Sequence, residues 1–234
     1  MIPLRDQNPS RSTPVVTRGL IVLNVAMFIY ELSLGPDLRD FLFSWGLVPA
    51  RLPAALEVGG ESLGWTGLTF VSSLFLHGGW AHLIGNMWYL WIFGDNVEDQ
   101  FGALPFLLFY VAAGVAASAL HVFSDLGSRL PTLGASGAIA GVLGAYAVMF
   151  PRARVYTLVP LFPFFQIIPL PAFLMLGVWF VFQFVAGAIS AGQAGASGGV
   201  AWWAHIGGFL FGVIVAKATS PFRHRPESYA EEVK

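Results

Sequence analysis

Residues 133–141 read LGASGAIAG, and one hydroxyl, that of Ser136, stands there among glycines and alanines. Small residues at this density let two membrane helices approach each other closely. The same stretch also offers a candidate nucleophile, because a serine becomes reactive once a neighbouring base takes its proton. The stretch by itself allows both interpretations, so the choice between them depends on the rest of the chain.

The composition of the chain indicates a membrane protein. Of its 234 residues, 56% are hydrophobic and 11% are charged, whereas soluble domains carry roughly 25% charged residues. The formal net charge of -1 argues against nucleic acid as a partner. The chain has no cysteine, which excludes disulfides and thiolate metal sites.

Six apolar stretches come close to the roughly 20 residues that cross a bilayer. They predict an all-α polytopic membrane protein with a six-transmembrane-helix bundle. The stretches are 15–34, 80–97, 104–123, 133–150, 171–189 and 200–218. The connection over 151–170 is also apolar, but its four prolines break helices, so we expect it at the membrane interface.

The Lys and Arg residues predict the orientation of this bundle, because they favour the cytoplasmic side. With the N-terminus inside, nine of them lie in inner segments and three in outer ones, which favours N-in/C-in. We therefore expect a cytoplasmic segment over 1–14, a membrane domain over 15–218 and a cytoplasmic tail over 219–234. Within the membrane domain, 35–79 forms the first extracytoplasmic loop and the Gly-rich stretch 190–200 the fifth.

In this topology, polar side chains from three predicted helices converge on one depth near the extracytoplasmic face. Ser136 and His205 open the fourth and sixth helices, and both helices run inward. His82 and Asn86 share one face at the start of the second helix. Polar groups inside a membrane are costly, so this convergence predicts a functional site.

The converging residues fit acyl transfer. His205 suits the role of a base near neutral pH, and Ser136 supplies the hydroxyl. A tetrahedral intermediate needs hydrogen-bond donors for its oxyanion, and the candidates are Asn86, His82 and the backbone N–H of Ser136. The residues from Val155 to Ala216 include no carboxylate, so we expect a Ser–His dyad and not a triad.

Small residues lie below both predicted catalytic residues on the same helical faces. Glycines and alanines at this spacing let the fourth and sixth helices approach closely enough for a hydrogen bond between them. The residues that we expect to support this packing are Gly137, Ala140, Gly144, Gly208 and Gly212.

Three motifs in this order, HGGWAHLIGN (77–86), GASG (134–137) and AHIGGFLFG (204–212), resemble those of the rhomboid family of intramembrane serine proteases. The resemblance implies a six-helix fold and cleavage of transmembrane protein substrates in the lipid bilayer, near its extracytoplasmic boundary. It assigns Ser136 as nucleophile and His205 as base. It places His82 and Asn86 at the oxyanion, with Gly134 in the loop that shapes the hole.

The resemblance further implies that 190–200 and the fifth helix act as a lateral gate, and that the protein lies in a prokaryotic inner (plasma) membrane. It calls for no cofactor and no metal. Two features depart from the family pattern. Ala140 stands where many members carry a tyrosine that stacks on the histidine, and 35–68 lacks a Trp-Arg pair that many members have.

Other interpretations remain open. In a second interpretation, the chain resembles a noncatalytic rhomboid-like membrane protein that binds transmembrane helices. His77, His82 and His205 offer nitrogen ligands for zinc, although the first two are five residues apart and splay on a helix. A transporter is disfavoured, because its broken helices are expected at mid-membrane. We interpret His77 as an interfacial loop residue and Gln183 as a satisfied polar group in the fifth helix.

Overall fold

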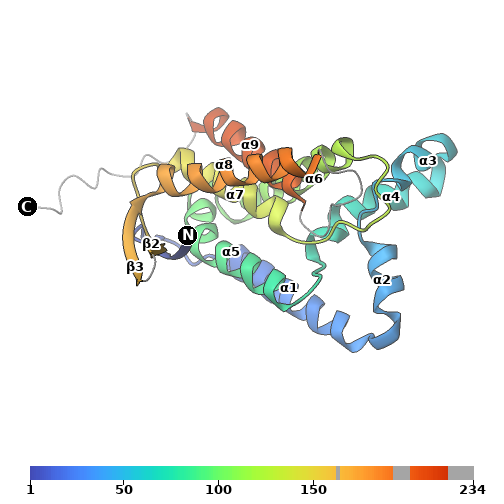
Figure 1. Cartoon of the computed structure of the whole chain (residues 1–234), viewed down its shortest axis with the longest axis horizontal. Helices are drawn as coiled ribbons and strands as arrows, with labels where there is room; N and C mark the ends of the chain where they lie inside the picture. The colour runs from blue at the N-terminus through green and yellow to red at the C-terminus, as the bar shows by residue number, and fades with distance from the viewer. Residues whose placement is uncertain (162–163, 192–200, 221–234) are drawn as a thin grey trace, which may run out of the picture.

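The computed structural model describes residues 1–161, 164–191 and 201–220 of the chain. It is mostly helical, and its longer helices lie side by side along the long axis of the molecule (Figure 1). This arrangement confirms the predicted bundle of membrane helices. The longer helices are α1 (Val15–Ser33), α5 (Trp80–Phe101), α6 (Ala103–Ser124), α7 (Ser136–Met149), α8 (Ala172–Ala191) and α9 (Trp202–Ala218).

The segment 35–79, predicted as the first loop, folds into short helices at one end of the bundle (Figure 1). They are η1 (Gly35–Asp37), α2 (Leu38–Trp45), α3 (Arg51–Val58), α4 (Gly60–Ser72) and η2 (Ser73–Phe75). The predicted fifth loop falls almost entirely on 192–200, and most of the predicted tail falls on 221–234. Both of these ranges lie outside the described residues.

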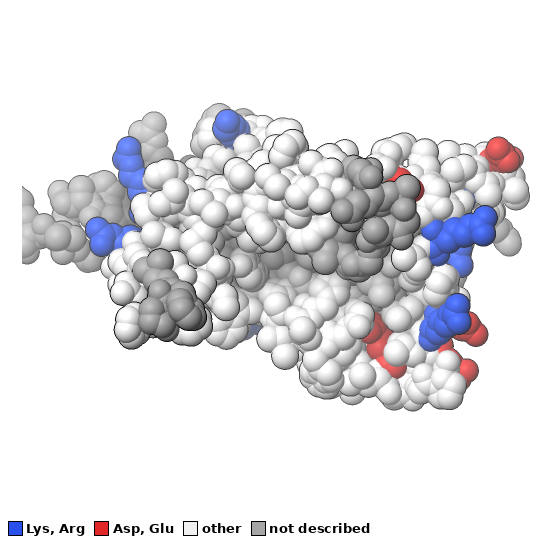
Figure 2. All heavy atoms as spheres, in the orientation of Figure 1, with Lys and Arg blue, Asp and Glu red and all other residues white. Residues whose placement is uncertain are grey.

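Apolar helices and the distribution of charge identify an integral, multi-pass membrane protein. Within the described residues, three helices are long and apolar enough to cross a membrane, namely α1, α6 and residues 172–189 of α8. Helices α7 and α9 are apolar but shorter. On the face shown in Figure 2, the charged residues gather toward the two ends, and the band between them is uncharged. The number of membrane crossings stays a prediction.

A three-stranded antiparallel sheet lies at the end of the bundle opposite to α2 and α3 (Figure 1). Its order is β1 (Ile2–Asp6), β2 (Arg154–Leu161) and β3 (Phe164–Pro171). The register pairs Ile2 with Leu158 and Arg154 with Pro171. Prolines are tolerated there because they lie in the edge strands or, like Pro160, beyond the reach of the first strand. The described residues of 151–170 are thus non-helical, as predicted, but the pairing of this segment with the N-terminus was not predicted.

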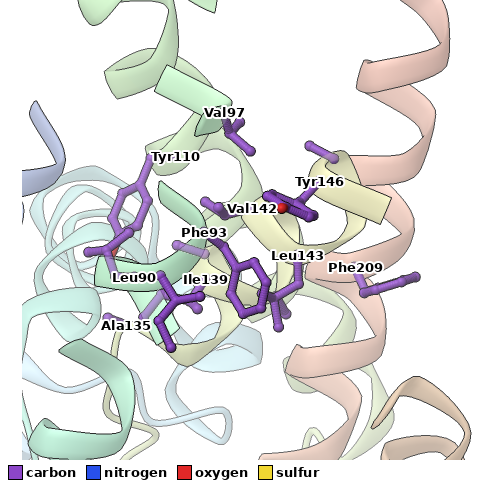
Figure 3. Packing of buried hydrophobic residues seen from close by; sticks show 14 of the residues in the cluster. Leu90, Phe93, Val97, Tyr110, Ala135, Ile139, Val142, Leu143, Tyr146 and Phe209 are labelled. Atoms are coloured by element: carbon purple, nitrogen blue, oxygen red, sulfur yellow. The ribbon is translucent and has the colours of Figure 1, made fainter. Parts of the chain in front are cut away.

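Helix α7 forms the centre of the bundle. Every residue from Gly137 to Tyr146 is buried, as expected for a helix that is apolar on all sides. Figure 3 shows its side chains packed with those of α5, and the rings of Phe93 and Tyr146 meet edge to face at 4.9 Å. Ser136 therefore begins a helix whose position is fixed by neighbours on all sides.

Glycines bring α7 and α9 into backbone contact. A Cβ added to Gly208 would overlap the carbonyl oxygen of Gly137, and one added to Gly212 would overlap that of Gly141. Gly144 meets the backbone of α9 in the same way. Such contacts are possible only where no side chain intervenes. The residues expected to support the packing, Gly137, Ala140, Gly144, Gly208 and Gly212, all lie in this contact between α7 and α9.

The sheet is tied to α7 through Asp6, whose carboxylate accepts a hydrogen bond from the Tyr146 hydroxyl at 2.6 Å. Burial raises the pKa of Asp6 from 3.8 to about 6, and repulsion from Asp95 adds to this, whereas the bond from Tyr146 opposes it. The folded protein thus holds a proton that the unfolded chain releases. Its contribution to stability is complete below pH 4 or so and is lost as the pH rises through about 6.

Replacing Asp6 by asparagine is therefore expected to stabilise the protein at pH 7.5, because the amide keeps an acceptor for Tyr146 without a buried charge. The gain in melting temperature should shrink as the pH is lowered toward 4. Thermal unfolding of the full chain in detergent at several pH values measures it. The same substitution at Asp37, which is exposed, is the control. An equal gain at every pH would contradict the assignment to Asp6.

Candidate active site

Ser136 is the first residue of α7, and the chain enters this helix through a turn at Gly134. Gly134 has a φ of +115°, a conformation that residues with a side chain rarely adopt. Its N–H donates to the carbonyl oxygen of Ser73 at 2.9 Å, which ties the turn to η2. The first N–H groups of a helix lack intrahelical partners and form the positive end of its dipole. Ser136 therefore lies where a negatively charged oxygen is stabilised.

The side chains of His82 and Asn86 lie against Gly134. A Cβ added to Gly134 would be 2.5 Å from Nε2 of His82 and 3.5 Å from Nδ2 of Asn86. Asn86 is only 7% exposed, so its amide is held in place by its surroundings. The structure thus brings His82 and Asn86 together with Gly134, which precedes Ser136 by two residues in the chain.

His77 holds the Asn86 amide in place, a role that the sequence analysis missed. Asn86 donates one N–H from Nδ2 to Nε2 of His77 at 3.0 Å, which leaves its second N–H for another acceptor. His77 lies between η2 and α5, where burial and repulsion from His82 lower its pKa to about 4. It is therefore neutral and able to accept. Its backbone N–H donates to the buried carboxylate of Glu31 at 3.2 Å, which anchors this connection to α1.

His205 lies in the first turn of α9, and α8 supplies the groups around its ring. Oε1 of Gln183 is 2.8 Å from Nδ1 of His205. The ring centroids of Trp179 and His205 are 5.9 Å apart at an angle of 37°, and Trp202 meets the imidazole edge to face at 6.3 Å. His205 has no tyrosine partner at position 140. Its ring is held instead by the amide of Gln183 and the indoles of Trp179 and Trp202.

The contact between α7 and α9 places Ser136 and His205 at the same level. Their sequence neighbours lie close together, since a Cβ added to Gly137 would be 3.7 Å from the Cβ of Ala204. Both Ser136 and His205 are half-buried and not sealed in the core. His82 also interacts electrostatically with His205. Elements α5, α7 and α9 therefore present their polar residues to one region of the molecule.

The zinc interpretation gains no support from this region. Within the described ranges, no three His, Cys, Asp or Glu side chains are grouped in a way that could hold a metal ion. The residues instead combine a hydroxyl, an imidazole with an acceptor at Nδ1, and several N–H donors near a helix N-terminus. Such a set suits nucleophilic attack on a carbonyl group.

The position of Gln183 in the sequence indicates a functional role that the sequence analysis did not assign to it. Between Ala172 and Ile189 it is the only side chain with an amide or a charge, and polar residues in a membrane helix are usually functional. The interpretation as a satisfied polar group was correct in kind, but it did not identify His205 as the partner. That partner depends on how α8 is rotated against α9.

Comparison with known proteins agrees with this arrangement. Residues 64–222 match the Rhomboid domain, which covers all the residues of the candidate site. The chain belongs to the rhomboid family. The match confirms the resemblance drawn from the three motifs.

Several curated rhomboid proteins are similar to this chain. It is 33% identical over 166 residues to Rhomboid protein 1, mitochondrial, of Saccharomyces cerevisiae, covering 68% of this chain and 44% of the yeast protein. It is 38% identical over 133 residues to Rhomboid protease GluP of Bacillus subtilis, covering 56% and 24%. It is 32% identical over 155 residues to presenilin-associated rhomboid-like protein A, mitochondrial, of Danio rerio, covering 62% and 36%. The chain spans less than half the length of each of these relatives.

Proposed function

We propose that this rhomboid is an intramembrane serine endopeptidase that cleaves transmembrane protein substrates. The observation that carries the proposal is the placement of Ser136 and His205 at one level of the contact between α7 and α9. The similarity to a rhomboid protease of Bacillus subtilis supports it.

The reaction follows from the roles of these groups. The Ser136 hydroxyl oxygen attacks the carbonyl carbon of the scissile peptide while Nε2 of His205 takes its proton. The tetrahedral intermediate then collapses, its C–N bond breaks, and His205 returns the proton to the leaving amine. Water, deprotonated by His205, then attacks the carbonyl carbon of the remaining ester. The bond to the Ser136 oxygen breaks as His205 returns the proton to that oxygen, which releases the carboxylic acid and regenerates Ser136 and the neutral imidazole. These are the steps of acyl transfer by a serine and a histidine.

The oxyanion of each intermediate needs donors that are already in place. In this proposal they are the free N–H of Asn86, a ring N–H of His82 and the backbone N–H of Ser136. The turn at Gly134 allows them to converge, because a side chain there would occupy the space next to His82.

The membrane character of the fold supports the proposed substrate and location. A substrate helix enters from the bilayer and unwinds near its extracytoplasmic boundary, where α7 and α9 begin if the protein is N-in/C-in. The segment 35–79 then faces the outside and the sheet of β1, β2 and β3 the cytoplasm. The relatives named above include both bacterial and mitochondrial proteins, and within the proposal we place this protein in a prokaryotic plasma membrane.

The test is turnover by the purified full chain in liposomes that carry a single-span substrate with a fluorescent label. Cleavage is expected to continue in excess chelator and to stop after treatment with a fluorophosphonate, with the reagent found on Ser136 by mass spectrometry. Loss of cleavage in chelator would favour the zinc interpretation. Firm binding of the substrate helix without any turnover would favour the noncatalytic rhomboid-like alternative.

A further inference from the structure

Gln183 is a buried amide in an otherwise apolar helix, and it meets the base of the candidate site. Its side chain is 6% exposed, whereas its neighbours Phe182 and Phe184 are 63% and 50% exposed. An amide placed in such surroundings is costly unless it is hydrogen-bonded. The bond of 2.8 Å between its Oε1 and Nδ1 of His205 supplies the partner.

The direction of this bond sets the tautomer of His205. A carbonyl oxygen only accepts, so the proton of the neutral imidazole lies on Nδ1 and the lone pair lies on Nε2. That lone pair is what a base needs in order to take the proton of Ser136. The opposite tautomer would place a proton on Nε2 and could not act as a base.

The same bond also gains strength during the reaction. When Nε2 takes a proton, the imidazole becomes a cation, and its Nδ1–H makes a charge-assisted hydrogen bond to Gln183. The bond is therefore stronger in the transition state than in the ground state, which is the condition for lowering the barrier.

Helix α8 fixes the orientation of the His205 ring as well as its tautomer. Trp179 lies one turn before Gln183 on the same helical face, and its indole lies beside the imidazole at 5.9 Å. Position 140 cannot supply such a ring, because Ala140 lies in the contact with Gly208 and its side chain ends at Cβ.

We propose that Gln183 is the positioning residue of His205, and that Ser136, His205 and Gln183 act as a relay with an amide in place of the usual carboxylate. This inference rests on the proposed function, since it assigns a role within the same reaction. It gives α8 a part in catalysis that the dyad predicted from sequence lacks.

The experiment compares Gln183→Leu and Gln183→Glu with the parent in the liposome assay, over a range of pH. Gln183→Leu keeps the volume but removes the acceptor, and kcat is expected to fall by about 10- to 1,000-fold with KM unchanged, in the direction seen when a base loses its orienting partner. Gln183→Glu is expected to restore turnover and to move the acidic limb of the kcat profile to higher pH, because a carboxylate favours the imidazolium.

Among the residues that the structure describes, the titratable side chains that interact with His205 are His82 on α5 and His121 on α6, and both are unchanged in these variants. Phe123→Leu, at a side chain of α6 that is 69% exposed, is the matched control and should retain the parent kcat and pH profile. Melting temperatures in detergent show that each variant is folded.

Two results would overturn the role of Gln183. One is a Gln183→Leu variant with the parent kcat, and the other is a Gln183→Glu variant whose acidic limb coincides with that of the parent. If the parent is active, either result leaves the proposed endopeptidase function unaffected. A parent without turnover would instead contradict the proposed function, so the two failures are distinguishable.

Discussion

Replacing Ser136 by alanine is expected to lower kcat for a transmembrane substrate by about 10⁴- to 10⁶-fold, the range found when a catalytic serine is removed. The hydroxyl is the only group of the protein that forms a covalent bond to the substrate in the proposed reaction. Binding of the substrate helix should change little, because one oxygen atom is lost from a half-buried position. Turnover and substrate binding are measured separately in liposomes.

Matched variants show whether this loss is specific to the site. Ser118→Ala makes the same change at a serine of α6 that is 5% exposed and should leave kcat near the parent value. His205→Ala should lose about as much activity as Ser136→Ala, and the double variant little more, because such residues act as a unit. Cleavage by Ser136→Ala at the parent rate would refute the mechanism.

Replacing Gly212 by alanine is expected to have the largest effect on stability. The added Cβ would overlap the carbonyl oxygen of Gly141 and lie 3.0 Å from the backbone nitrogen of Ala145. Backbone atoms in a packed helix cannot move away singly, so α7 and α9 must separate along their contact. Overpacking of this kind costs typically 1–3 kcal/mol.

The site depends on the same contact, so Gly212→Ala should also reduce turnover, although Gly212 lies two turns below His205. Thermal unfolding in detergent and turnover in liposomes measure the two effects. Gly177→Ala in α8 is the control, because, its own helix backbone and chain neighbours aside, no atom of a described residue lies within 4 Å of the Cβ it would add. There the better helix propensity of alanine should leave stability unchanged or slightly raised. Equal behaviour of the two variants would contradict the close packing of α7 and α9.

Much of the candidate site follows from local spacing. Glycines three, four or seven residues apart share a helical face wherever the helix lies, so Gly208 and Gly212 could be assigned to a close contact without a structure. His82 and Asn86 share a face for the same reason. The expected convergence with Ser136 rests on the topology that composition and charge predict.

The sheet shows where this reasoning stops. Four prolines predict that 151–170 is not helical, yet nothing local indicates that Ile2 pairs with Leu158. Pairing between segments so far apart depends on how the bundle brings its ends together. In the part of the chain that the structure describes, three helices meet the length and hydropathy expected of a membrane span, and the six crossings of the sequence analysis remain a prediction.

The sequence by itself determined the family, the membrane environment and the choice of Ser136 and His205 as candidate nucleophile and base. These depend on composition and on the spacing of residues along single helices. Only the tertiary structure decided what holds His205. Gln183 and Trp179 reach the imidazole through the rotation and the shift of α8 against α9, and Asn86 meets His77 across a turn. Those contacts depend on six degrees of freedom between rigid elements, which no periodicity within one helix specifies.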